Sequence, residues 1–247
     1  MFETTFQVPY YGLDAHERVK AGLLLQFLQE AAALHAKTRE IGVSDLHARG
    51  LTWVLRRYRI NVREYPGLGG LTVRTWYEPK KNLMSIRAFE IRDAAGDIVA
   101  DAWSSWIVVD LERGRPVRLD RALPAVYYEG TDPTGTGVED SMADVGDDCD
   151  TECAFLVRRN ELDLNGHTNH TVYFDWALET VPDEVAADYA PVELDAQYLA
   201  SAMREEVLVR TKRTASSADT VAFSHAVLLA KDGTEAARLA TTWRRAT

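Results

Sequence analysis

The chain has 247 residues, of which 46% are hydrophobic and 27% are charged, and its formal net charge is −10. This length suffices for one large domain or two small ones with an ample core, and the composition is that of a globular protein. No apolar run approaches the roughly 20 residues of a membrane span, and the first residues resemble neither a signal peptide nor a transit peptide, so we expect a soluble, cytoplasmic protein. No basic aromatic platform or known motif suggests a nucleic-acid partner.

In the first half, a short strand predicted over Thr5–Pro9 precedes a helix from Ala21 to Arg39. The helix is apolar almost all round rather than along one stripe, so other structure must enclose it. Valine, isoleucine, threonine and aromatic residues dominate the segments that follow, as in half-buried strands. We predict these β segments at Thr52–Arg63, Gly70–Tyr77, Met84–Asp93 and Ile98–Leu111.

An acidic segment follows the first half. Between Ala122 and Val157 the sequence has nine acidic residues and no lysine or arginine, so the remaining chain is close to neutral. Several glycines and few large apolar residues accompany these acids, a composition typical of linkers. We therefore predict an acidic linker over 126–152, between domains at 1–125 and 153–247. Its two cysteines, Cys149 and Cys153, are expected to be free thiols, because a reducing cytoplasm disfavours disulfides.

The second half repeats the plan of the first. We predict a strand over Ala154–Arg158 and a helix from about His170 to Thr180. Further β segments are predicted at Ala196–Met203, Glu206–Lys212, Thr220–Lys231 and Glu235–Arg244. An enclosed helix followed by antiparallel strands predicts, in each half, a sheet wrapped around a helix.

Short matching motifs indicate that the two halves arose by duplication. Leu13-Asp14 corresponds to Leu162-Asp163 at an offset of 149 residues, whereas Ser104-Ser105-Trp106 corresponds to Thr241-Thr242-Trp243 at an offset of 137. Several such matches in the same order are the signature of an internal repeat. The change in offset predicts a longer insertion in the first half after its Leu-Asp pair.

The stretch Asp163-Leu164-Asn165-Gly166-His167 concentrates reactive side chains just before the second predicted helix. Asp, Asn and Gly are also common turn residues, so the stretch taken alone favours a structural turn. In that interpretation Thr168 or Asn169 caps the helix that follows.

Two observations favour a functional site instead. The matching first-half stretch, Asp14-Ala15-His16-Glu17-Arg18, keeps the aspartate but has histidine in place of Asn165, arginine in place of His167, and no glycine. If the stretch were only a turn that the fold needs in both halves, the two copies could have kept similar turn residues. A histidine at a helix entry also lies near backbone N–H groups that can stabilise a developing oxyanion.

The stretch from Arg159 to Pro182, with Asp163-x-Asn165-Gly166-His167-x-Asn169, Tyr173, Trp176 and Glu179, resembles the signature of acyl-acyl carrier protein thioesterases. First-half segments that also resemble this family are Tyr65-Pro66-Gly67, Thr75-Trp76, Arg87-x-Phe89-x-Ile91 and Ser104-Ser105-Trp106. The resemblance covers nearly the whole chain outside the acidic linker. It implies an α+β, tandem (double) hot-dog fold, in which each half is an antiparallel sheet wrapped around a central helix.

The resemblance also implies the activity, which is hydrolysis of fatty acyl-acyl carrier protein thioesters to free fatty acid and carrier protein, ending chain elongation. The acyl chain would bind in the N-terminal half, and the catalytic residues would lie in the C-terminal half. Asp163, Asn165 and His167 match the catalytic positions. Asp163 would activate water or attack the thioester directly, Asn165 would hold the geometry, and His167 would stabilise charge or protonate the leaving thiolate.

The sequence departs from the family at one place. The plant enzymes have a Glu-Cys pair downstream of the helix, and anchoring on Tyr198 and Arg204 puts Ser201-Ala202 there. A cysteine nucleophile is therefore not expected. Ser201 and Asn169 are candidate supporting residues, and Glu205 or Glu206 would take the place of the missing carboxylate only if the register slips.

The predicted partner is acyl carrier protein carrying a fatty acyl chain. Because carrier proteins are acidic, docking needs a basic patch, predicted among Arg158, Arg159, Arg210, Lys212 and Arg213.

No cofactor or metal is expected, because the usual ligand spacings are missing. Two fused hot-dog domains already pair with each other as single hot-dog domains do by dimerising, so a monomer would suffice, although a homodimer stays open. The alternatives are an acyl-CoA thioesterase and a non-catalytic acyl-binding or regulatory module.

Overall fold

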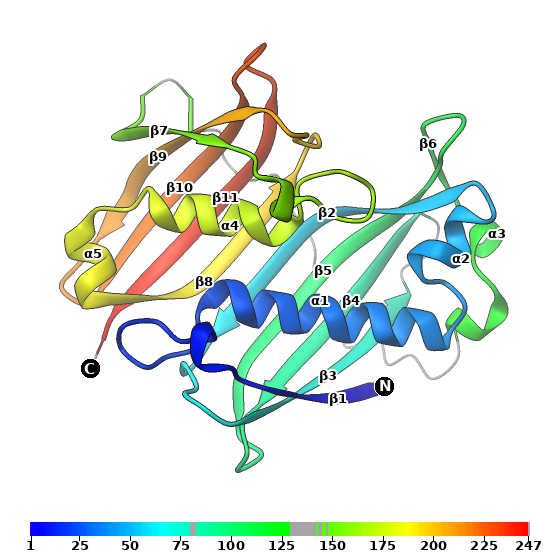
Figure 1. Ribbon diagram of the computed structural model, residues 1–247, viewed down its shortest axis with the longest axis horizontal. Coiled ribbons are helices and arrows are strands. Elements are labelled where there is room, and N and C mark those ends of the chain that lie inside the picture. Colours follow the sequence, from blue (N-terminus) through cyan, green and yellow to red (C-terminus); the bar gives the residue numbers. More distant parts are fainter. Residues whose placement is uncertain (80–82, 129–141, 143–144, 147, 247) are drawn as a thin grey trace. The chain divides into compact units, whose positions relative to one another are not determined.

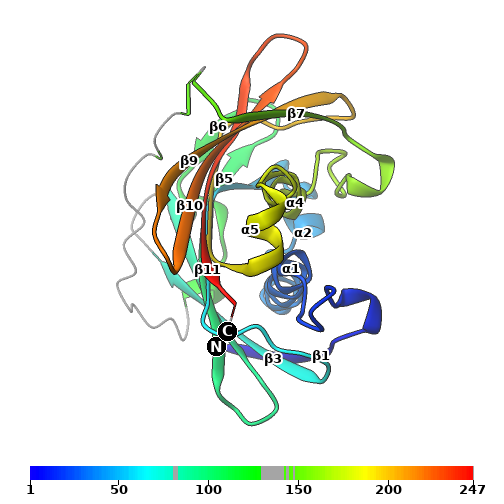
Figure 2. The ribbon, with the colours of Figure 1, turned by 90° about the vertical axis from the view of Figure 1, so that its left-hand side faces the viewer.

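The computed structural model describes residues 1–79, 83–128, 142, 145–146 and 148–246. The chain folds into two compact units, the first with the elements from β1 to η2 except residues 59–61 of β2, and the second with those three residues and the elements from β7 to β11 (Figure 1). In each unit the longest helix lies against one face of an antiparallel sheet (Figure 2). Most of the predicted linker at 126–152 lies outside the described residues.

The N-terminal unit has its strands in the order β1-β3-β4-β5-β2, with β6 paired to β5. Helix α1 is enclosed as its composition predicts, because Leu24, Leu25 and Leu28 are completely buried. The elements are β1 (Phe2–Gln7), η1 (Tyr10–Gly12), α1 (Ala21–Thr38), α2 (Val43–His47), β2 (Leu51–Val62), β3 (Gly70–Pro79), β4 (Met84–Arg92), β5 (Ile98–Asp110), β6 (Arg115–Val117), α3 (Leu119–Ala122) and η2 (Ala125–Tyr128).

The C-terminal unit has its strands in the order β8-β11-β10-β9-β7. Its central helix buries Phe174 and Ala177 completely and Trp176 almost completely. The elements are β7 (Thr151–Leu156), η3 (Arg159–Glu161), α4 (His170–Glu179), α5 (Asp183–Asp188), β8 (Tyr189–Tyr198), β9 (Glu206–Ser216), β10 (Thr220–Leu229) and β11 (Glu235–Arg245).

The internal repeat extends to the three-dimensional structure. The first strand, the 3-10 turn and the central helix of the two units begin at a constant offset of 149 residues, whereas β3 and β9 begin at an offset of 136. The difference arises partly because α1 has 18 residues and α4 has 10. The longer insertion predicted for the first half is therefore largely an extension of its central helix.

Buried polar contacts repeat as well. The indole N–H of Trp106 donates to the Ser104 hydroxyl at 2.8 Å, and that of Trp243 donates to the Thr241 hydroxyl at 3.0 Å. Each contact lies on the last long strand of its unit and satisfies an indole N–H that would otherwise lose its hydrogen bond on burial. The Ser-x-Trp and Thr-x-Trp matches in the sequence thus mark the same structural position.

One predicted strand is misplaced. The sequence predicts a strand over Ala196–Met203, but β8 runs from Tyr189 to Tyr198 and residues 199–205 form the connection to β9. The physical reason is that the backbone groups of Ala202 bond outside the sheet, to Thr168 and to Tyr173. The helices α2, α3 and α5 and the short strand β6 were also not predicted from the sequence.

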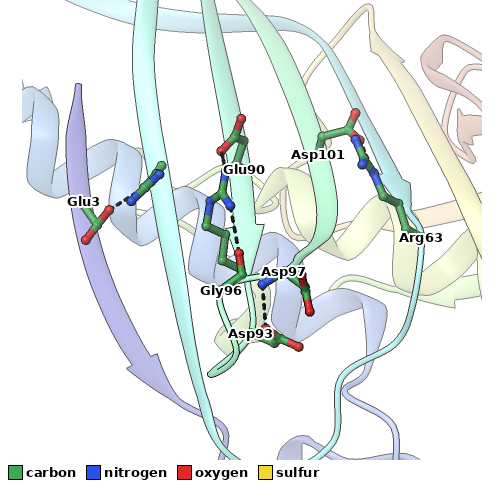
Figure 3. A network of polar contacts seen from close by, with 9 residues as sticks. Glu3, Arg63, Glu90, Asp93, Gly96, Asp97 and Asp101 are labelled. Carbon is green, nitrogen blue, oxygen red and sulfur yellow. Dashed lines mark hydrogen bonds and ion pairs between the residues drawn. The ribbon is translucent and has the colours of Figure 1, made fainter.

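Charged side chains form a row across the sheet of the N-terminal unit (Figure 3). Glu3, Arg74, Glu90 and Asp101 are cross-strand neighbours on β1, β3, β4 and β5. Arg74 binds Glu3 at 2.5 Å, and Arg63 binds Asp101 at 3.0 Å (Figure 3). Each partly exposed pair contributes only about 0.2–1 kcal/mol, so this row marks the solvated face of the sheet rather than a site.

No helix among the described residues is long and apolar enough to cross a membrane.

Candidate active site

The predicted catalytic residues lie on a tight loop of the C-terminal unit, between η3 and α4. The Asp163 carboxylate organises this loop, because its Oδ1 accepts the backbone N–H groups of Asn165 at 2.8 Å and His167 at 3.1 Å. A bridge between Leu162 and Thr168 closes the loop, and Gly166 supplies a left-handed φ of +73°. The structural interpretation of the motif as a turn is therefore correct, whatever its chemistry.

The first-half copy forms the same loop with different chemistry. Asp14 Oδ1 accepts the backbone N–H groups of His16 at 2.8 Å and Arg18 at 3.0 Å, and a bridge joins Leu13 to Val19. Glu17, at the place of Gly166, keeps a left-handed φ of +59°. Both halves thus need the same backbone, and the missing glycine does not mean that the turn is lost.

The two copies differ at the second carboxylate oxygen. Asp14 Oδ2 accepts the Nε and Nη2 groups of Arg18, both at 3.0 Å. Partial burial works against ionisation of Asp14, but backbone N–H donors and the Arg18 guanidinium prevail and lower the pKa of this carboxyl. The first-half aspartate is therefore held as an ion pair.

In the second half, the corresponding contact of Asp163 Oδ2 is only the Asn165 side-chain amide at 3.4 Å, which is long for a hydrogen bond. His167 replaces the arginine, and its imidazole has no hydrogen-bonding partner within the part of the chain that the structure describes. Asp163 and His167 are half-buried and Asn165 is exposed. The loop thus presents a carboxylate oxygen without a cationic partner among the described residues, beside a neutral amide.

Asn169 is the N-cap of α4. Its Oδ1 accepts the backbone N–H of Thr171 at 3.0 Å and the Thr171 hydroxyl at 3.1 Å. The helix begins three residues after His167, and the cap already binds the Thr171 N–H, which is therefore not available to an oxyanion. The structure supports Asn169 as a helix cap and shows no contact of its side chain with Asp163.

The connection over residues 199–205 packs against the catalytic loop through the backbone of Ala202. Its carbonyl accepts the Thr168 N–H at 2.9 Å, and its N–H donates to the Tyr173 hydroxyl at 3.0 Å. The side chain of Ser201 is exposed and makes no hydrogen bond to another described residue. Residues 201–202, which the sequence places where the plant enzymes have the Glu-Cys pair, thus lie beside the candidate site. Their contacts with the loop and with Tyr173 are made by the backbone of Ala202 and not by side chains.

Two groups near the site could not be assigned from the sequence. Tyr173 is buried, and burial raises the pKa of its phenol, an effect that the nearby charges of Glu205 and Asp163 increase. Glu205 is half-buried: Oε1 accepts the Met203 N–H at 3.1 Å, and Oε2 binds Lys231 at 3.0 Å. The register that the sequence left open therefore places Glu205, and not the exposed Glu206, near the phenol.

In the C-terminal unit His225 is completely buried and His170 is partly buried. Burial lowers the pKa of His170 to about 4 and that of His225 to about 3, so both are neutral near pH 7. His225 is held between Thr211 at 2.8 Å and Thr241 at 3.0 Å. The contacts of His225 are those of a structural histidine. His167 is the accessible imidazole of the candidate active-site loop.

Most of the predicted basic patch is neutralised. Ion pairs join Arg158 to Glu161 at 2.5 Å, Arg210 to Glu152 at 2.7 Å, Lys212 to Asp148 at 2.5 Å and Arg213 to Glu184 at 3.9 Å. Asp148 and Glu152 belong to the acidic segment, whose end therefore folds back onto β9 instead of remaining apart. Of the five predicted cations, Arg159 alone has no ion-pair partner among the described residues.

Two family models match the chain. The acyl-ACP thioesterase N-terminal domain matches residues 1–127, and the acyl-ACP thioesterase C-terminal domain matches residues 146–245. Together they cover both units and include the whole of the candidate active-site loop.

Plant proteins are among the relatives in sequence. An acyl-[acyl-carrier-protein] hydrolase of Cuphea viscosissima, FATB2, is 26% identical over 99% of this chain and 63% of its own length. A dodecanoyl-[acyl-carrier-protein] hydrolase of Cinnamomum camphora is 26% identical over 99% of this chain and 68% of its own length. The chain thus spans about two thirds of these relatives.

Solved structures of similar proteins establish the fold. A 12:0-ACP thioesterase from Umbellularia californica superimposes with a TM-score of 0.86 at 23% identity, covering 99% of this chain and 94% of that one. An acyl-ACP thioesterase from Bacteroides thetaiotaomicron gives a TM-score of 0.84 at 22% identity, covering 98% of this chain and 96% of that one. These likenesses confirm the predicted α+β double hot-dog fold.

Proposed function

The chain belongs to the acyl-ACP thioesterase family, and we propose that it hydrolyses the thioester between a fatty acyl chain and acyl carrier protein, releasing free fatty acid. The reaction would end fatty acid chain elongation, and we expect it to take place in the cytoplasm. The observation that carries the proposal is the difference between the two loops. Asp14 is bound by Arg18, whereas among the described residues Asp163 Oδ2 meets only an amide.

In the proposed mechanism, Asp163 Oδ1 stays bound to the loop backbone and Oδ2 does the chemistry. As a general base, Oδ2 takes a proton from water while the water oxygen forms a bond to the thioester carbonyl carbon. The tetrahedral intermediate then collapses and the C–S bond breaks. The sulfur leaves with the electron pair and receives a proton, for which the imidazolium form of His167 is the proposed donor, and the proton that Asp163 took from water then restores the imidazolium. Asn165 would orient Asp163 or the substrate.

A nucleophilic route uses the same oxygen. Here Asp163 Oδ2 bonds to the acyl carbon, the thiolate leaves, and water hydrolyses the mixed anhydride. Only this route forms a covalent acyl adduct on Asp163, so mass spectrometry of rapidly quenched enzyme should detect the adduct if the route is used, whereas the general-base route leaves the enzyme unmodified. Neither route uses the Ser201 side chain, and we propose for Ser201 and Asn169 only support of the loop.

A hydrolysis panel tests the proposal. Thioesters of saturated chains from short to long are presented on acyl carrier protein and on coenzyme A, and thiol release is measured at catalytic enzyme concentrations. The proposal expects turnover on the carrier protein with higher kcat/KM than on coenzyme A. Faster hydrolysis of the coenzyme A thioesters would favour an acyl-CoA thioesterase, and tight binding without turnover would favour an acyl-binding module.

A further inference from the structure

The exposed apolar side chains of the C-terminal unit gather around the candidate active site. Among its described residues, four large hydrophobic side chains are exposed. They are Leu156 (64% exposed), Leu164 (90%), Leu199 (38%) and Met203 (46%). Leu156 is the last residue of β7, Leu164 lies on the β7–α4 connection between Asp163 and Asn165, and Leu199 and Met203 lie on the β8–β9 connection. We call these four residues the apolar rim.

The two connections form one continuous surface. Val157, next to Leu156, donates its N–H to the Glu205 carbonyl at 3.0 Å, and Thr168 donates to the Ala202 carbonyl at 2.9 Å. Asn169 donates to the Glu161 carbonyl at 2.8 Å, which ties the 3-10 turn to the helix start. Both connections therefore lie at the N-terminal end of α4 (Figure 1). The apolar rim is a surface held by backbone hydrogen bonds.

Two arginines border the apolar rim without ion-pair partners in the described part of the chain. Arg159 lies at the start of η3 and Arg204 follows Met203, and both are exposed. The other cations and acids nearby are largely matched, since Arg158 binds Glu161 and Lys231 binds Glu205. Apart from Asp163 itself, Glu206 is the exposed acid that remains beside the two arginines.

This combination indicates the chemistry of an occupant. Apolar side chains exposed together, with charged residues at their edge, are typical of protein interaction surfaces. Two arginines without an ion-pair partner among the described residues favour an acidic partner. A membrane surface would also accept apolar and basic groups, but recognition of anionic lipid commonly uses clusters of about 4–8 cations, and the rim has two beside one acid.

We propose that the acidic carrier protein docks on the apolar rim, with Arg159 and Arg204 facing its acidic side chains. The proposal rests on the proposed function, because it names the surface through which that substrate is recognised. It moves the predicted docking surface away from Arg210, Lys212 and Arg213, which ion pairs occupy, to the rim of the loop that carries Asp163. A partner seated there would lie directly over the candidate catalytic oxygen.

The test compares one acyl chain on two carriers. Acyl carrier protein presents the docking partner, whereas acyl-pantetheine has neither protein nor phosphate. In the double variant Arg159→Glu and Arg204→Glu, the ratio of kcat/KM on carrier protein to that on pantetheine should fall at least about tenfold, mainly through KM, because reversed rim charges repel an acidic partner. Added salt should raise KM for the carrier protein in the unmodified enzyme, because it screens the attraction between opposite charges, and this rise should be lost in the variant.

A matched control changes the net charge equally at a distant place in the sequence. Arg115 on β6 and Arg121 on α3 are exposed, and Arg115→Glu with Arg121→Glu should leave the ratio within about twofold, because long-range effects of net charge alone are screened by salt. Met203→Asp should lower the ratio without any change at an arginine. An unchanged ratio in the arginine variant, or an equal fall in the control, would overturn the docking proposal.

Two further measurements separate the possible failures. If the variant lost both activities equally, the arginines would act on catalysis or folding and the docking proposal would be wrong. Binding to phosphatidylglycerol vesicles that disappears in the variant while the ratio stays constant would assign the rim to membranes instead. If the unmodified enzyme hydrolysed neither thioester, the proposed function would fail. Direct binding of acyl carrier protein to the enzyme and to the variant would then still test the rim.

Discussion

Replacing His167 with arginine would give the catalytic loop the ion pair of its first-half copy. In that copy, Arg18 contacts Asp14 Oδ2 through two nitrogen atoms at 3.0 Å, with side-chain exposures of 21% and 31%. Because the two loops share their backbone hydrogen bonds, an arginine at position 167 is expected to reach Asp163 Oδ2 in the same way. His167→Arg should therefore keep the fold and lose the activity.

The magnitudes follow from the geometry of the Arg18 pair. A partly exposed ion pair contributes about 0.5–1 kcal/mol, so the melting temperature should stay the same or rise by about 1–4 °C. The same energy lowers the pKa of a carboxylate by roughly 0.4–0.7 units. This change alone is small, but the guanidinium also occupies the oxygen that must accept the proton or attack the substrate. Loss of that role should lower kcat by about 10²–10⁴-fold.

Thiol release from acyl-acyl carrier protein measures the effect, and His167→Ala is the control that removes the imidazole without adding a cation. Cys149 and Cys153 are free and half-buried, so the enzyme must be kept well below substrate concentration when a thiol reagent is used. We expect His167→Arg to be at least tenfold slower than His167→Ala. Equal rates for the two variants, with both folded, would refute a reactive role for Asp163 Oδ2.

Four other predictions address neighbouring groups. Asp163→Asn keeps an acceptor for the loop N–H groups, so it should fold normally while kcat falls about 10³-fold. Asp163→Ala should also lose about 2 kcal/mol of unfolding free energy. Near-normal turnover by the asparagine variant would exclude Asp163 as base or nucleophile. Tyr173→Phe leaves the buried Ala202 N–H without its acceptor, so it should lower kcat and reduce the unfolding free energy measured with urea by about 1–3 kcal/mol. The control Tyr198→Phe removes the hydrogen bond to the His170 carbonyl and should leave kcat unchanged. Equal effects of the two variants on kcat would contradict a positioning role for Tyr173. Asn169→Ala should lose about 1 kcal/mol of cap energy, which Asn169→Asp restores, and hydrolysis that failed to recover with stability would reveal a chemical role instead. The pKa values of His170 and His225 are about 4 and about 3 in the folded protein, below the ordinary 6.5, so at acidic pH the unfolded chain binds more protons than the folded chain. The unfolding free energy should therefore fall as pH drops below 6.5, by up to about 1.4 kcal/mol per pH unit for each histidine. Urea denaturation at several pH values should show this slope and a flatter one in His225→Gln, and an unchanged slope in that variant would contradict a neutral buried His225.

Much of the fold could be predicted because periodicity and repetition report backbone structure directly. The enclosed helix α1 follows from its all-round apolar composition, and the matched Leu-Asp pairs mark loops that share a bridge and two N–H bonds to the aspartate. The predicted β segment over 196–203 failed at its end for a physical reason. Its residues are apolar enough for a strand, and only a contact distant in sequence, from Ala202 to Tyr173, draws them out of the sheet.

The site was only partly accessible from the sequence. Asp163, Asn165 and His167 are neighbours along the chain, so their proximity needed no folding information. The environment of Glu205 and the neutralised cations of β9 depend on which segments meet across the sheet, such as Glu152 with Arg210 and Asp148 with Lys212. The acidic composition of 126–152 indicates a linker, but composition does not report that its end supplies ion-pair partners to β9.

The contrast between the two loops also suggests how the proposed reaction would proceed without the Glu-Cys pair of the plant enzymes. At Ser201-Ala202 the chain contributes a backbone carbonyl and N–H to Thr168 and Tyr173, and these contacts do not depend on the side chains present. The loops differ at four positions after the aspartate, and the exchange of Arg18 for His167 is the difference that leaves Asp163 Oδ2 without an ion pair among the described residues. If that exchange creates the reactive group, the residues at 201 and 202 set only its position, and Ser201→Ala should hydrolyse acyl-acyl carrier protein at nearly the unmodified rate.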